Sequence, residues 1–68
     1  MEAREIGEQI KERRNILSLQ QRDLAELSSI SLRTIIQIEN GSGNPSLNTL
    51  QKLVKVLGLD VKLTIKNK

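Results

Sequence analysis

Two polar side chains four residues apart, Arg33 and Gln37, could each form a pair of hydrogen bonds with one planar partner. The guanidinium of Arg33 matches the O6 and N7 atoms of guanine, and the amide of Gln37 matches the N6 and N7 atoms of adenine. Leu32 and Ile36 stand next to them in the sequence, and either side chain could cover the methyl group of thymine. The chemistry available to these four side chains is recognition rather than bond making.

Catalysis and metal binding have almost no candidates. The 68 residues contain no His and no Cys, which removes zinc ligands, thiol chemistry, disulfides and the commonest general base. Phe, Tyr and Trp are also absent, which excludes an aromatic stacking platform for single-stranded nucleic acid. The glutamates near the start decorate the exposed face of a helix: Glu2, Glu5, Glu8 and Glu12. We expect neither an enzyme nor a protein that needs a cofactor or a metal.

The formal charge of +3 is unevenly distributed. Residues 1–40 carry six basic and seven acidic side chains, whereas residues 41–68 carry five Lys and one Asp. A small excess of basic side chains, confined to the C-terminal part, is only a weak indication that the protein binds nucleic acid. The first ten residues lack the apolar run of a signal peptide, and no stretch approaches the roughly 20 apolar residues of a membrane span. We expect a cytoplasmic protein without membrane contact, associated with the nucleoid when bound to DNA.

Apolar periodicity predicts four helices, over about residues 3–17, 21–28, 32–40 and 47–57. Ser31 and Ser46 are good N-cap residues for the last two, and Gly41 and Gly58 end them. In the second helix, Leu24 and Leu27 are expected to face inward. The stretch GSGNPS separates the last two helices as a loop.

After Gly58 the apolar period changes from about 3.6 to two residues, which predicts a strand over residues 60–66. A single strand is not stable alone, and no second strand can be recognised in the chain. We therefore expect the strand to pair with a second copy, in an antiparallel ribbon formed by Val61, Leu63 and Ile65. The alternative is a frayed tail. Residues 1–59 would form the domain and residues 60–68 a dimerisation strand and tail.

Residues 21–40 have the pattern of two short helices joined by a tight turn, which is typical of a helix-turn-helix. Ala25 is small enough to let the two helices approach where they cross. Ile30, Ile35 and Ile38 are expected to lock the pair together. None of these residues alone identifies a helix-turn-helix. Their fixed spacing before the segments Asn-Gly and Asn-Pro-Ser-Leu is quite specific for this motif.

With this motif the sequence resembles the Cro/phage-repressor (XRE-type) helix-turn-helix family over about residues 6–59. The matching residues are Ile6-Gly7, Arg14, Gln21, Leu24-Ala25, Ile35, Ile38-Glu39, Gly41, Pro45-Ser46-Leu47 and Leu57-Gly58. Ser29 stands where the family usually has Gly in the turn, and Gln20 where it usually has a Ser or Thr cap. The resemblance implies a mostly α, four-helix, phage-repressor-like domain, to which the C-terminal strand would be added.

The resemblance also implies that residues 32–40 form the helix that enters the major groove of double-stranded DNA. Base edges would be read by Leu32, Arg33, Ile36 and Gln37, and phosphates contacted by Gln21, Asn40, Ser42 and Ser46. Alternatively, Leu32 and Ile36 pack on a neighbouring subunit, and Gln21 and Asn40 are solvated helix caps. Arg14 and Glu39 are expected to form a structural ion pair.

These features predict a sequence-specific repressor that binds a palindromic operator as a homodimer. The ending DVKLTIK resembles that of HipB-type antitoxins, which repress their own operon and bind a HipA-type kinase toxin. A stand-alone XRE-type repressor without a toxin is the alternative within this class. The alternative from a different functional class is an interaction module whose main function is to bind and neutralise a protein partner.

Overall fold

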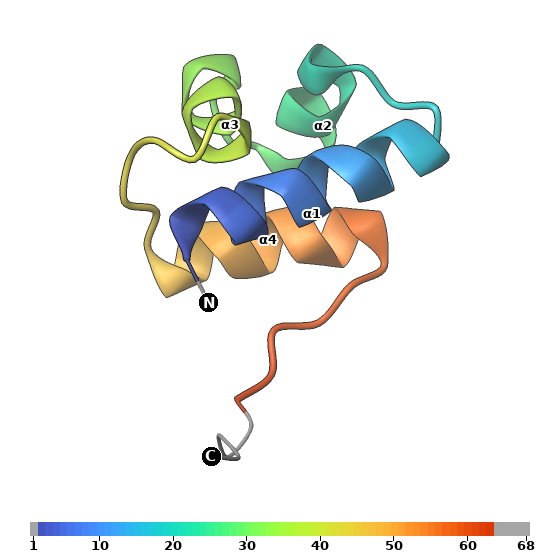
Figure 1. Ribbon diagram of the computed structural model, residues 1–68. Helices are drawn as coiled ribbons and strands as arrows, with labels where there is room; N and C mark the ends of the chain where they lie inside the picture. The colour runs from blue at the N-terminus through green and yellow to red at the C-terminus, as the bar shows by residue number, and fades with distance from the viewer. Residues whose placement is uncertain (1, 64–68) are drawn as a thin grey trace.

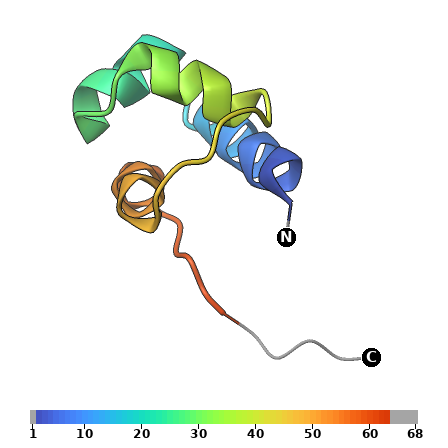
Figure 2. The same cartoon turned by 90° about the vertical axis from the view of Figure 1, so that its left-hand side faces the viewer.

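Four helices are present in the computed structural model, which describes residues 2–63. They are α1 (Ala3–Ile16), α2 (Gln21–Ser28), α3 (Leu32–Glu39) and α4 (Leu47–Leu57). The mostly α, four-helix arrangement predicted from the sequence is confirmed, and each helix ends within one residue of its expected boundary. Figure 1 shows α2 and α3 together at one end of the molecule, with α1 and α4 below them. Figure 2 shows α1 and α4 as separate rods in contact with that pair.

Serine side chains start both α3 and α4. The hydroxyl of Ser31 accepts the backbone N–H of Thr34 at 3.2 Å, and the hydroxyl of Ser46 accepts that of Thr49 at 3.1 Å. Each bond satisfies one N–H group that lacks a partner in the first turn of a helix. Gly58 ends α4 with a φ of 72°, in the left-handed region that glycine adopts without a steric penalty.

The two departures from the family pattern flank α2. Ser29 adopts the left-handed conformation that the turn requires, with a φ of 61°. The backbone N–H of Gln20 donates to the carboxylate of Asp23 at 2.8 Å, and the two residues form a capping box at the start of α2.

An aliphatic core joins all four helices. Its buried side chains are Ile10, Leu24, Ile35, Ile38, Leu53 and Leu57. Ala25 and Ile30 are half-buried against this core, as expected for residues at the crossing of α2 and α3. Leu27 is 62% exposed, so its predicted inward position is wrong. Helix α2 is only eight residues long, and Leu24 and Ser28 are the residues that it buries.

Helices α1 and α3 lie close together at Gly7. A Cβ atom there would collide with the backbone carbonyl oxygen of Ile38 and approach that of Glu39 to 3.0 Å. Because these atoms belong to the backbone of α3, they cannot move aside as a flexible side chain would. The missing side chain of Gly7 therefore sets the spacing between α1 and the C-terminal end of α3.

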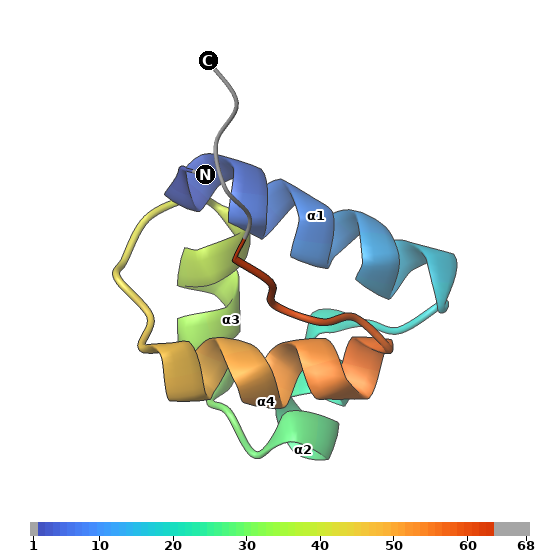
Figure 3. The same cartoon turned by 90° about the horizontal axis from the view of Figure 1, so that it is seen from below.

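The chain continues beyond α4 as an irregular segment. Residues 59–63 form no strand in the structure, and residues 64–66 of the predicted strand lie outside the described residues. A strand requires hydrogen bonds to a neighbouring strand, and a single copy of this chain offers none in its described part. Viewed from below, the segment leaves the end of α4 and crosses between α4 and α1 (Figure 3).

Candidate nucleic-acid interface

Helix α3 has one buried face and one exposed face. Ile35 and Ile38 are in the core, with exposed fractions of 0% and 4%. The predicted base-reading residues lie on the exposed face of the helix: Leu32, Arg33, Ile36 and Gln37. The structure brings these four together on one surface of one helix, as the helical spacing predicts.

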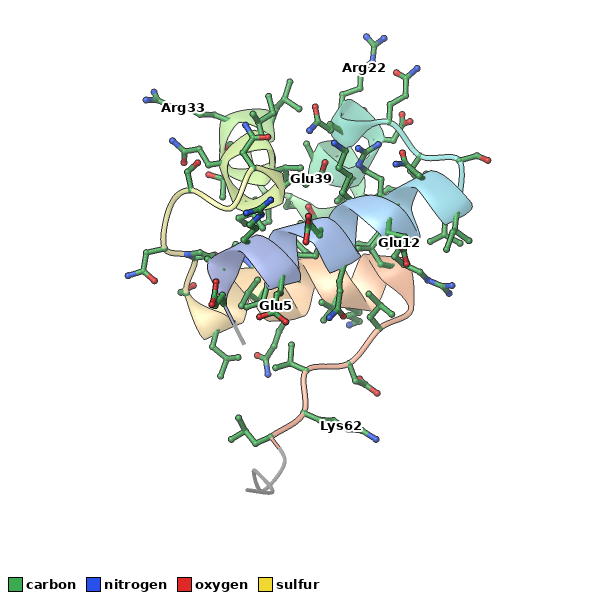
Figure 4. The ribbon with its side chains drawn as sticks, in the orientation of Figure 1. Glu5, Glu12, Arg22, Arg33, Glu39 and Lys62 are labelled. Atoms are coloured by element: carbon green, nitrogen blue, oxygen red, sulfur yellow. The ribbon has the colours of Figure 1, made fainter. Side chains whose placement is uncertain are left out.

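The exposed face is both polar and apolar. Arg33 extends from the outer edge of α3, at the end of the molecule farthest from the C-terminal segment (Figure 4). Leu32 is 43% exposed and Ile36 is 37% exposed, although both side chains are large and aliphatic. Two hydrogen-bonding groups beside two methyl-rich side chains are the combination that distinguishes bases in a major groove.

Three of the predicted phosphate contacts lie around the end of α3 and the start of α4. Asn40 is the exposed C-cap of α3. The hydroxyl of Ser42 donates to the carbonyl oxygen of Gln37 at 3.2 Å. The hydroxyl of Ser46 donates to Oγ1 of Thr49 at 3.1 Å while it caps α4. Both serine hydroxyls therefore already have local structural roles.

Gln21, the fourth predicted phosphate contact, is half-buried at the start of α2. Its Nε2 atom donates to Oε1 of Glu39 at 3.1 Å. One donor of the amide thus connects α2 to the end of α3. This bond gives Gln21 a structural role that its position in the sequence did not indicate.

Arg14 of α1 and Glu39 of α3 form a buried ion pair with two hydrogen bonds. Nε of Arg14 donates to Oε2 of Glu39 at 2.7 Å, and Nη2 donates to Oε1 at 3.0 Å. Nη1 of Arg14 also donates to the carbonyl oxygen of Leu19 at 2.8 Å. Hydrogen bonding to Glu39 raises the pKa of Arg14, while burial opposes this effect.

With Gln21, this pair forms a three-residue network that joins α1, α2 and α3. Removing one member of a buried ion pair leaves a charge without compensation, which is strongly destabilising. A folded-state pKa raised above that of the unfolded chain stabilises the fold below the unfolded value. For an arginine this range includes every pH at which the protein would be studied, so Arg14 stays charged.

Arg22, in the first turn of α2, is a further exposed cation that the sequence pattern did not single out. Its Nε atom donates to Oε1 of Gln20 at 3.0 Å. In Figure 4 it extends from the same end of the molecule as Arg33, whereas Lys62 is at the opposite end. A basic residue in the first turn of a helix is the signal that could have drawn attention to it.

Two of the predicted dimer residues lie in the described part of the C-terminal segment. Val61 is 45% exposed and Leu63 is 99% exposed. Ile65, the third, lies outside the described residues. Val61 and Leu59 border a groove of about 490 Å³ between α1 and α4, which is also lined by Ile6 and Leu50.

Two other kinds of site can be assessed for residues 2–63. The described residues contain no group of His, Cys, Asp or Glu side chains that could hold a metal ion. None of the helices in this range combines the length and apolar character needed to cross a membrane.

Comparison with known proteins agrees with this geometry. Residues 10–63 match the helix-turn-helix family model. The chain is 42% identical over 55 residues to the HTH-type transcriptional regulator PuuR of Escherichia coli strain K12, and to that of Shigella flexneri at the same identity. The match covers 81% of this chain but only 30% of either relative. Since the family model includes all of α2, α3 and α4, the chain belongs to the helix-turn-helix family.

Proposed function

We propose that this chain is a sequence-specific double-stranded DNA-binding transcriptional regulator, acting as a repressor. The observation that carries the proposal is the exposed face of α3. Leu32, Arg33, Ile36 and Gln37 share that face, and the opposite face is fixed in the core through Ile35 and Ile38. A rigidly held helix with base-recognising side chains on its outer face fits the width of a major groove.

Contacts with the DNA backbone would position α3 without reading sequence. Asn40, Ser42 and Ser46 surround the end of α3 that is followed by the loop, and Gln21 lies at the start of α2. In a helix-turn-helix the first helix of the motif crosses the backbone, so contacts from α2 and from this loop would lie on either side of the groove. The amide of Gln21 would contact a phosphate while its other donor keeps the bond to Glu39.

The regulator would act as a twofold homodimer on a palindromic operator. Val61 and Leu63 expose apolar side chains beyond α4, and the alternation continues to Ile65 in the sequence. Pairing of two such segments in an antiparallel ribbon would satisfy their backbone groups and cover the groove between α1 and α4. Twofold symmetry would place the two α3 helices about one helical turn of DNA, or a multiple of it, apart.

Two alternatives within this proposal differ in the partner of the regulator. In the HipB-like form it is an antitoxin that also binds a HipA-like kinase toxin, which the resemblance of the segment DVKLTIK to HipB-type antitoxins favours. In the stand-alone form it has no toxin partner, and the similarity to proteins named as transcriptional regulators supports this form. Purification of the tagged chain from its native cell separates them: a kinase-like protein that co-purifies supports the antitoxin form, and a homodimer alone supports the other.

Selection from a pool of random DNA duplexes tests the proposed function. We expect the chain to enrich a short palindromic sequence and to bind it more tightly than a scrambled duplex of equal length. The matched control is the variant Arg33→Ala,Gln37→Ala, which keeps the buried face of α3. Enrichment of no sequence by the unmodified chain would contradict the proposal, and so would equal enrichment by the control.

A further inference from the structure

We propose that Arg22 is a phosphate-positioning residue that Gln20 holds in place, a role that rests on the proposed DNA binding. The DNA backbone beside the start of α2 would be its partner. The residue would fix how α3 sits in the groove and would not read bases. Three observations lead to this assignment: the orientation of the guanidinium, the acceptor that Gln20 supplies, and the charge and place of Arg22 in the first turn of α2.

The first observation is the orientation of the guanidinium. Its Nε donates to Oε1 of Gln20 at 3.0 Å, which restrains a long side chain that is otherwise exposed. An arginine has five N–H donors, and this bond uses the one on Nε. The outward edge formed by the two terminal nitrogens has the planar fork that suits two phosphate oxygens.

The second observation is that Gln20 supplies the acceptor for this bond while it also forms the capping box of α2 with Asp23. The family pattern has a Ser or Thr cap at this position, whereas here Asp23 accepts the N–H of Gln20 and secures the helix start. The longer amide of Gln20 also reaches Arg22. It therefore supplies an acceptor that a Ser or Thr side chain is too short to place there.

The third observation is electrostatic. Arg22 is in the first turn of α2, where the helix dipole is positive and disfavours a cation. It extends from the same end of the molecule as Arg33, away from Lys62 and the acidic face of α1 around Glu5 and Glu12 (Figure 4). A phosphate at this end would compensate for the unfavourable position, because its charge is opposite to that of both the side chain and the helix end.

The dependence of binding on salt tests the assignment. We compare the full chain with Arg22→Gln and Arg22→Lys on the selected duplex and on a scrambled one. For Arg22→Gln we expect about tenfold weaker binding to both duplexes. We also expect the slope of log K against log salt to become shallower by about one unit per bound chain. Lys52→Gln removes the same charge from the exposed surface of α4 and should change neither quantity.

Arg22→Lys tests whether the planar fork of the guanidinium is needed. It keeps the charge, so the salt slope should stay close to that of the unmodified chain, but the ammonium cannot present a planar fork and affinity should fall about threefold. Unchanged affinity and slope for Arg22→Gln would overturn the assignment while leaving the proposed function intact. A shift in preferred sequence would overturn it too, by making Arg22 a base reader. If the unmodified chain binds no duplex, both proposals fail.

Discussion

Arg33 and Gln37 differ from their aliphatic neighbours in what they can distinguish. A bidentate pair of hydrogen bonds matches one base edge and leaves unpaired groups on any other, whereas an aliphatic contact only favours the methyl group of thymine. Leu32 and Ile36 are more than one-third exposed in the free protein. A DNA partner that covered them would remove this apolar surface from water, whatever the base beneath them. Sequence preference should therefore depend more on the polar pair than on the aliphatic pair.

Arg33→Ala should weaken binding to the preferred duplex by about 1–3 kcal/mol and relax the preference at one base pair in each half-site. The exposed side chain supports no core contact, so its removal should leave the fold unchanged. Binding to a set of duplexes that vary at single positions measures both effects. Affinity and preference equal to those of the unmodified chain would show that Arg33 does not contact bases.

Asn40→Ala is the matching test for a contact with the backbone. Asn40 is the exposed C-cap of α3, and a phosphate contact there carries no sequence information. We expect the variant to bind preferred and scrambled duplexes more weakly by the same factor. A loss confined to the preferred duplex would assign Asn40 to base reading instead.

Glu39→Ala should lower the melting temperature far more than Glu26→Ala does. Loss of Glu39 leaves the buried guanidinium of Arg14 without its carboxylate and costs about 3–5 kcal/mol. Glu26 is on the exposed surface of α2, where a substitution changes stability by about 0.5 kcal/mol or less. Thermal unfolding followed by circular dichroism compares the two variants, and equal melting temperatures would contradict a stabilising role for the ion pair.

At the scale of the helices, the sequence was sufficient for α1 to α4 because their signals are local. Apolar spacing, the serine caps and the glycines at 41 and 58 all act within a few residues, and they predict the helix ends to within one residue. Leu27 was misassigned because its spacing from Leu24 suits an inward position, but whether a side chain is covered depends on the neighbouring helices. In α2 those neighbours cover Leu24 and Ser28 and leave Leu27 exposed.

The candidate site likewise combines features that local sequence predicts with contacts between distant residues that it does not predict. That Leu32, Arg33, Ile36 and Gln37 share one face follows from helical geometry, so the sequence was enough to group them. The bond from Gln21 to Glu39 joins residues 18 positions apart on two helices, which no local pattern encodes. The predicted strand beyond Gly58 needs a second chain, and alternation alone cannot show whether one is present.

Gly7→Ala tests the close approach of α1 to α3. Alanine favours helices over glycine, so local propensity alone would stabilise the variant by about 1 kcal/mol. The added Cβ would instead meet the backbone carbonyl of Ile38, and we expect net destabilisation of about 1–3 kcal/mol. Urea unfolding measures the difference, with Gln9→Ala on the exposed face of α1 as control. A Gly7→Ala variant more stable than the unmodified chain would show that α1 can move away from α3 at little cost.

For the whole molecule, the proposed dimer depends on residues 60–68. Deleting them should make the chain monomeric at micromolar concentration and remove most of its affinity for a palindromic duplex, because two half-sites would no longer be bound together. Sedimentation of the full and truncated chains checks the first effect, and binding to a single half-site is the control for folding. A truncated chain that remains dimeric would place the interface elsewhere.

The C-terminal segment leaves α4 on the side of the molecule opposite α2 and α3 (Figure 1). A domain that follows residue 63 would therefore begin on the side away from the proposed DNA-binding surface of α3. A sensory or enzymatic domain could then be joined to the four-helix unit without a change to the exposed side chains of α3. The matched relatives are consistent with such modularity, since the shared stretch makes up only 30% of their length.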